Sequence, residues 1–300
     1  MLQNCLRSIS QMEIPQGWQV SVLVIDNSSL AQADSIMHSM NETFLARLKY
    51  VHEPRPGIPF ARNRALHECE VGDQDWIAFI DDDECVDRKW LAHMVEALTA
   101  TQADVFHGQT ESKPDPAFPL FWPQKNKKRH RRPLATLQTA GTDNVMLRQN
   151  LVSAKGLGLR FDENMQFSGG SDREFFYRAS DLGARIVWVP EAKAFEFTPP
   201  SRHTFWYQVN RAQSVAANEC YISRKRRGLA RTAISNGAKA AVRLVGGILM
   251  LPTGLLILLS ERNAPRIAFL KASKDIASAI GTARGLFKKP PQRYTTIHGN

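Results

Sequence analysis

The 300-residue sequence predicts an α/β fold in which helices cover a mostly parallel sheet. Short apolar runs rich in β-branched residues, such as 20–25 and 76–80, alternate with stretches of helical periodicity. Acidic residues follow both of these runs directly. The chain has 43% hydrophobic and 23% charged residues, a globular composition that excludes a disordered or fibrous protein.

The order of the elements follows from where these runs start and stop. Each apolar run ends at a turn signal or at charged residues, and this predicts strands at 20–25, 48–52, 76–80, 103–109, 144–147, 184–189 and 194–197. Helical spacing predicts helices up to about 47 and at 61–69, 87–100, 171–182 and 203–227, with Asp87 as an N-cap. Parallel sheets bind ligands at the carboxyl ends of their strands. The acids after 25 and after 80 therefore predict one ligand site between them.

Charge is distributed unevenly along the chain. Residues 1–220 hold 24 Lys and Arg against 27 Asp and Glu, whereas residues 221–300 hold 15 against 2. This predicts a globular domain at 1–225 and a basic, helical, surface-binding tail at 226–300. The four cysteines show no paired spacing, and no signal-peptide pattern is present. These features exclude a disulfide scaffold and a zinc ribbon, and they favour a reducing compartment with no disulfide partner.

The acids Asp81, Asp82, Asp83 and Glu84 come directly after an apolar strand. Four adjacent carboxylates repel one another unless a cation lies among them. Mg²⁺ and Mn²⁺ take oxygen ligands of this kind and bridge to phosphates. We therefore expect a metal–diphosphate site here, and the alternative is a helix N-terminus that carries acids because of the helix dipole.

Three further residues are candidates for the same edge of the sheet. Asp26 would hydrogen-bond a base or ribose, or would serve only as a helix cap. Asp172, after two glycines, would be a general base or an acid that complements a helix dipole. Arg62 would hold phosphates or be a surface charge. The basic run 125–132 is interpreted as a solvated loop, or as a flap over an anionic ligand.

Several segments, taken in order, resemble family 2 glycosyltransferases with the GT-A fold, a Rossmann-like sheet with helices on both faces. The resemblance covers about residues 1–220 and is strongest to bacterial exopolysaccharide enzymes of the succinoglycan type. The segments are LVIDNSS (23–29), EPRPGIPFARNRAL (53–66), WIAFIDDDECVDRKWL (76–91), GTDNVMLR (141–148), FDENMQFSGGSDREFFYRASDLGARIVWVPEA (161–192) and PPSRHTFWYQVNRAQS (199–214).

The resemblance implies a role for each matching residue. Asp26 matches the acid that contacts the nucleotide base, and Arg62 lies in the segment against the nucleotide. Asp81 and Asp83 match the DxD pair, with Asp83 as the direct ligand of Mn²⁺ or Mg²⁺ and Asp81 nearer the ribose and diphosphate. Asp82 lies between them, in the same cofactor-binding turn. Asp172 matches the catalytic base.

Two positions depart from the family pattern. Ser171 replaces the first acid of the Glu-Asp pair in which Asp172 is the base. The family's first strand, which lies inside the sheet beside the strand at 20–25, has no counterpart in this chain. Unpaired buried backbone groups cost about 1–3 kcal/mol each. This leads us to expect either a start further upstream or a weakly active form.

The chemistry of the acids agrees with those roles. A nucleoside-diphosphate sugar carries an acidic leaving group, so a cation on the diphosphate and a base on the incoming hydroxyl are sufficient. The expected reaction is an inverting transfer from a donor, expected to be a UDP-sugar, to a lipid-linked glycan or exopolysaccharide intermediate. The alternatives are a nucleotidyltransferase, or a catalytically weak, N-terminally truncated, membrane-docked binding protein.

The tail predicts attachment to a membrane. Residues 244–260 form 17 uncharged positions, near the lower limit of a bilayer span, with Pro252 and Gly254 in the middle. A short span, a re-entrant hairpin or a soluble core helix would account for them. The segment 264–287 predicts an amphipathic basic helix on an anionic membrane, and no nucleic-acid motif accompanies it. We expect the cytoplasmic face of a bacterial inner membrane.

Overall fold

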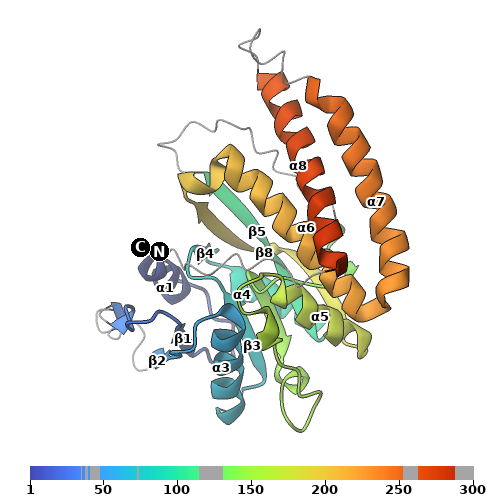
Figure 1. Cartoon of the computed structure of the whole chain (residues 1–300). Coiled ribbons are helices and arrows are strands. Elements are labelled where there is room, and N and C mark those ends of the chain that lie inside the picture. The colour runs from blue at the N-terminus through green and yellow to red at the C-terminus, as the bar shows by residue number, and fades with distance from the viewer. Residues whose placement is uncertain are drawn as a thin grey trace. The chain divides into compact units, whose positions relative to one another are not determined.

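The computed structural model describes residues 1–34, 36, 37, 40, 48–72, 74–114, 131–252 and 263–287 (Figure 1). Its contacts group the chain into two compact units. The first consists of Met1–Lys113, Lys127–Gln166 and Ser171–Phe197, and the second holds Phe167–Gly170 and the chain from Thr198 onward. Each unit is described by itself.

The first unit contains the described strands, apart from the final residue of β5 and of β8, and the shorter α-helices. In chain order these are α1 (Leu2–Ser10), β1 (Val22–Asp26), β2 (Leu48–His52), α3 (Ile58–Val71), β3 (Trp76–Ile80), β4 (Glu84–Val86), α4 (Trp90–Ala100), β5 (Val105–Pro114), β6 (Thr136–Leu137), β7 (Asn144–Arg148), the 3₁₀ helices η1 (Gln149–Leu151) and η2 (Glu163–Met165), α5 (Ser171–Asp181) and β8 (Ile186–Thr198).

The strands form two sheets. Six strands take the order β3-β7-β5-β8-β4, with β6 paired to β8, and β1 and β2 form a separate two-stranded sheet. The β1–β2 pair is parallel, with Val22 opposite Leu48. The β3–β7 pair is antiparallel, with Trp76 opposite Arg148, and β7 also runs antiparallel to β5. Among the described residues β1 pairs with β2 alone.

The expectation of a mostly parallel sheet is wrong, because the sheet is mixed. Two parallel strands need a crossover connection, which is usually a helix. Helix α4 lies in the connection between β3 and β5, which run in the same direction. The strands β6 and β7 follow β5 without a described helix between them. β7 therefore returns antiparallel between two strands that share one direction.

Helices cover both faces of the six-stranded sheet, as expected. Alternate side chains point to opposite faces of a strand, and the two cores divide in that way. On one face Val145 and Leu147 pack with Phe175 of α5 and Leu66 of α3. On the other, Met146 packs with α4.

Two local predictions need correction. The strands expected at 184–189 and 194–197 are one strand, β8. Helix α4 begins at Trp90 rather than at 87, because Asp87 closes the preceding turn by accepting a hydrogen bond of 2.9 Å from the Lys89 N–H. The expected helix up to about 47 lies largely outside the described residues, as does most of the basic run 125–132.

The second unit is helical. It contains η3 (Pro200–His203), α6 (Phe205–Arg227), α7 (Leu229–Met250) and α8 (Asn263–Phe287). α8 packs against both α6 and α7 (Figure 1). Helix α7 takes in the first residues of the apolar run 244–260, and positions 253–260 lie outside the described residues. No helix in the described part of the chain is long and apolar enough to cross a membrane.

Candidate active site

The acidic turn after β3 has its negative charges at the surface and one acid inside. Asp81 and Asp82 are exposed, Asp83 is half-buried, and Glu84 is 2% exposed. The Glu84 N–H closes the turn by donating a hydrogen bond of 3.1 Å to the Asp81 carbonyl oxygen, and β4 starts at Glu84. The turn therefore presents three carboxylates at the carboxyl end of β3.

The surroundings of this turn disfavour further negative charge. Desolvation by the surrounding protein raises the pKa of Asp81 to about 7; Arg62 opposes the rise, and Asp143 and the neighbouring acids add to it. Burial, followed by the charges of Asp81 and Asp143, raises the pKa of Glu84 to about 10, so Glu84 is neutral at pH 7.

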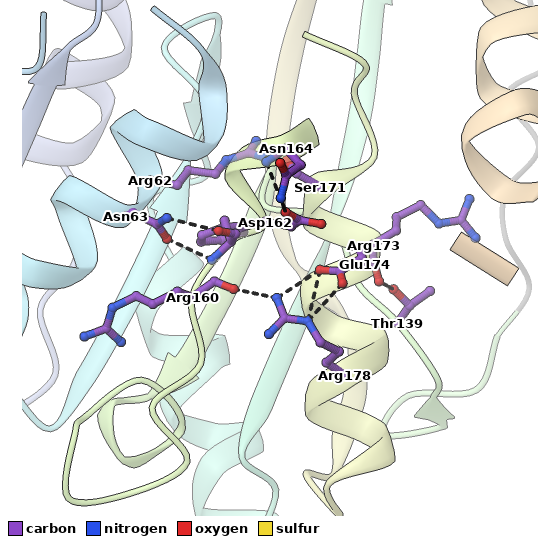
Figure 2. Close-up of polar contacts among 11 residues, drawn as sticks. Arg62, Asn63, Thr139, Arg160, Asp162, Asn164, Ser171, Arg173, Glu174 and Arg178 are labelled. Atoms are coloured by element: carbon purple, nitrogen blue, oxygen red, sulfur yellow. Dashed lines mark hydrogen bonds and ion pairs between the residues drawn. The ribbon is translucent and has the colours of Figure 1, made fainter. Parts of the chain in front are cut away.

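Arg62 lies next to both the acidic turn and the start of α5. It projects from α3 and donates from Nη1 to the Ser171 Oγ over 3.3 Å (Figure 2). Its guanidinium carbon also lies 5.5 Å from the centroid of the Phe161 ring. Its charge also lowers the pKa of Asp81. The Arg62 guanidinium thus lies near the acidic turn and also bonds Ser171, the residue that precedes Asp172 in the chain.

A network of ion pairs fixes the helix that carries Asp172. Arg178 bonds Glu174 one turn earlier in α5, with Nε···Oε1 at 3.0 Å, and also donates to the Arg160 carbonyl (Figure 2). Arg160 in turn pairs with Glu70 of α3 at 2.6 Å. The network connects three segments: α3, the chain just before η2, and α5. These bonds hold in place the helix α5, which carries Asp172.

Asp143, in the turn before β7, lies close to Asp172. A Cβ built on Gly141 would lie 2.0 Å from the Asp143 Oδ1 and 3.5 Å from the Asp172 Oδ2. Because both distances start from one point, the two oxygens are at most 5.5 Å apart. Asp143 also raises the pKa of Asp81 and of Glu84. It therefore lies between the acidic turn and Asp172.

Asp26 is buried and holds the turn after β1. Its carboxylate accepts from the Ser28 N–H at 2.8 Å, the Ala33 N–H at 2.9 Å and the Tyr50 hydroxyl at 3.0 Å. Burial raises its pKa, but these hydrogen bonds outweigh burial, so that the pKa lies below its ordinary value. Asp26 is an ionised cap of this turn, and no recorded contact among the described residues joins it to Asp81 or Asp172.

The acidic turn suits a divalent ion for which the protein supplies only some of the ligands. In the described ranges no three His, Cys, Asp or Glu side chains are close enough together to hold a metal. Mg²⁺ commonly binds through one or two carboxylates, with waters and substrate phosphates as the other ligands. The exposed Asp81 and the half-buried Asp83, in surroundings with an excess of negative charge, fit that mode.

Arg62 connects part of the set of residues expected from the sequence, and no contact recorded among the described residues joins Asp26 to that part. The structure brings Arg62 close to the acidic turn and to the start of α5, where Asp172 lies. The sequence did not point to Asp143. Its only signal was a single acid in the segment GTDN directly before a strand, in a chain with 29 acids.

Sequence comparison decides the family. The model of glycosyl transferase family 2 matches residues 1–153, about half of the chain. The chain belongs to glycosyl transferase family 2. It is a glycosyltransferase, and the DxD turn and the start of α3 lie inside the matched region.

One curated relative covers more of this family 2 chain. The succinoglycan biosynthesis protein ExoM of Rhizobium meliloti (strain 1021) is 29% identical over 258 residues, which is 84% of this chain and 82% of the relative.

Solved structures agree on the fold, which is GT-A-like. S. aureus TarS superposes with a TM-score of 0.53 at 14% identity, over 94% of this chain and 52% of that chain. TarS 1-349 in complex with UDP-GlcNAc gives a TM-score of 0.53 at 16% identity, over 94% of this chain and 87% of that one.

Proposed function

We propose that this glycosyltransferase moves a sugar, with inversion, from a UDP-sugar to a hydroxyl of a lipid-linked glycan or exopolysaccharide intermediate. The observation that carries the proposal is the position of Arg62, which is near Asp81 and bonded to Ser171, the neighbour of Asp172. The relative in succinoglycan biosynthesis supports the acceptor class. The TarS complex with UDP-GlcNAc supports the donor class.

In the proposed reaction the acceptor oxygen attacks the anomeric carbon as the bond from that carbon to the diphosphate oxygen breaks. Asp172 accepts the proton of the attacking hydroxyl, a contribution of about 10²–10⁴ in rate. Asp143, within 5.5 Å of Asp172, accepts a hydrogen bond from the acceptor sugar and orients it. The ion pairs of Arg178 and Arg160 hold the base in position.

The donor would lie along the edge formed by the turns after β1 and β3. Asp83 and Asp81 would hold Mn²⁺ or Mg²⁺, which offsets the charge that develops on the leaving diphosphate. Arg62 would contact the diphosphate, and Asp82 would lie beside it. Asp26 would hold the turn against which the base and ribose lie.

We further propose a catalytic domain at 1–225 and a tail at 226–300 that binds an anionic membrane. The charge of the tail, 13 basic against 2 acidic residues, supports this division. The proposed location is the cytoplasmic face of a bacterial inner membrane, where a lipid-linked acceptor would meet a nucleotide sugar.

Asp172→Asn tests the catalytic assignment. Full-length protein is supplied with Mn²⁺, a panel of nucleotide sugars and lipid-linked acceptor extract, and nucleoside diphosphate release is measured. Transfer should fall at least 10²-fold, with donor affinity nearly unchanged. The matched control is Asp181→Asn at the exposed far end of α5, which should transfer like the wild type. Wild-type turnover in Asp172→Asn would refute the base, and pyrophosphate as the product would favour a nucleotidyltransferase.

A further inference from the structure

The apolar side of α8, expected from the sequence to face a membrane, is occupied by other helices. Ala272 is fully buried. A Cβ on Gly281 would lie 2.1 Å from the Gln213 carbonyl oxygen of α6, and one on Gly247 of α7 would lie 2.9 Å from the Ala272 carbonyl oxygen. Because the backbones approach this closely on both sides, α8 is the inner helix of the second unit.

The exposed apolar side chains of this unit are concentrated on α7. Five of them form what we call the α7 stripe. Their exposed fractions are 75% for Ile234, 74% for Val242, 57% for Val245, 51% for Ile248 and 74% for Leu249. At 100° per residue they fall on one side of the helix, opposite Thr232, which is fully buried. The stripe is thus the outer face of a helix whose inner face packs on α8.

Every charge on α7 is positive. Arg231, Lys239 and Arg243 are exposed, and residues 229–250 contain no Asp or Glu. At 100° per residue Arg231 falls within the stripe, whereas Lys239 and Arg243 fall on the side of Thr232. An apolar face on a helix whose charges are all basic is the pattern of a helix that lies in the interface of an anionic bilayer. A second copy of this chain would bring another α7 with only basic charges to the contact, and no acid on α7 would pair with them.

We propose that the α7 stripe is the surface by which this enzyme docks on an anionic bilayer. The five apolar side chains enter the headgroup region, and Arg231 contacts the lipid phosphates. The positive charges of Lys239 and Arg243 add to the attraction between α7 and the anionic surface. This inference rests on the membrane association proposed above and assigns it to α7 instead of α8.

The test compares two sets of exposed residues in the full-length protein. The first variant combines Val242→Ser, Val245→Ser and Leu249→Ser on the stripe. The matched control combines Ile267→Ser, Ile280→Ser and Phe287→Ser, which are 37%, 45% and 77% exposed on α8. Binding is measured by co-sedimentation with vesicles of phosphatidylglycerol and phosphatidylcholine, and with vesicles of phosphatidylcholine alone. Circular dichroism and gel filtration check the fold and the oligomeric state.

The wild type and the α8 variant should bind the anionic vesicles, and the α7 variant should bind them about tenfold or more weakly. A second variant, Ile234→Ser with Ile248→Ser, should repeat the loss and keeps the test decisive if the first one misfolds. Undiminished binding by the α7 variants would overturn the assignment while leaving membrane association intact. A wild type that binds neither vesicle removes both proposals, and a wild-type dimer that the α7 variant dissociates assigns the stripe to self-association instead.

Discussion

Gly141→Ala should displace one carboxylate of the proposed site without removing any functional group. The new methyl group would lie 2.0 Å from the Asp143 Oδ1, whereas an ordinary contact begins at 3.4 Å. The Asp143 carboxylate must therefore move by about 1.4 Å, a difference taken from these two distances. The Asp172 Oδ2, at 3.5 Å, can stay where it is.

The expected result is a selective loss of transfer. A displacement of about 1 Å of a positioning group can reduce a rate about 10²-fold, so kcat for transfer should fall by about that factor. Donor affinity should remain, because no group that faces the diphosphate is changed. Since the obstructing atom is the end of a movable side chain, the free energy of unfolding should change by less than about 0.5 kcal/mol.

The assay is the release of nucleoside diphosphate at saturating donor, with donor affinity and urea unfolding measured in parallel. Gly237→Ala in α7 is the matched control, because a Cβ there meets nothing within 4 Å. Asp143→Asn should reproduce the loss with no steric conflict. If Gly141→Ala and Asp143→Asn both transfer at the wild-type rate, the role given to Asp143 is refuted.

Three further outcomes can be measured. Arg62→Ala should raise KM for the donor about 10- to 100-fold, the equivalent of the 1.5–3 kcal/mol of a charged hydrogen bond, and an unchanged KM would contradict the diphosphate contact. Asp26→Asn should be destabilising at pH 7 in urea unfolding. The folded-state pKa of Asp26 lies below the unfolded value of about 3.9, so its stabilisation is present above that pH and is lost as the pH falls through the folded pKa; the difference from the wild type should therefore shrink in acid, and a constant difference would contradict this. Asn144→Ala should lower the free energy of unfolding by about 1–3 kcal/mol for each buried group left unpaired, because the amide bonds the Trp90 N–H at 2.7 Å and the Ala192 carbonyl at 2.9 Å; an unfolding midpoint like that of the wild type would show that water replaces these bonds.

Much of the strand pattern could be predicted because local signals mark its limits. β2 and β3 begin and end at the residues expected, since charged or turn-forming residues bound each run. The sequence predicts strands at 184–189 and 194–197 where the structure has the single strand β8, and Pro190 lies between the two predicted strands. In the structure Pro190 lies between the part of β8 that pairs with β6 and the part that pairs with β4. The missing proline N–H therefore breaks neither of those pairings.

What the sequence could not reveal depends on contacts between distant segments. Asp143 is one acid in a short turn, and only folding brings it near Asp172. The roles of α7 and α8 were likewise hidden, since both helices have apolar and basic residues. The small residues Gly281 and Gly247 decide which helix is inner, through close approach to neighbouring carbonyls. The antiparallel direction of β7 was missed, and among the described residues no helix lies between β5 and β7.

The separation of β1 and β2 from the main sheet has a consequence for motion. A two-stranded ribbon is marginally stable alone, and its small apolar cluster is centred on Leu6, Met37 and Met40. Its amides should exchange with deuterium faster than those of β3 and β7, because local opening there requires less free energy than global unfolding. If the donor base rests on the Asp26 turn, occupancy will slow that exchange, and the substrate itself will complete the order of this corner of the enzyme.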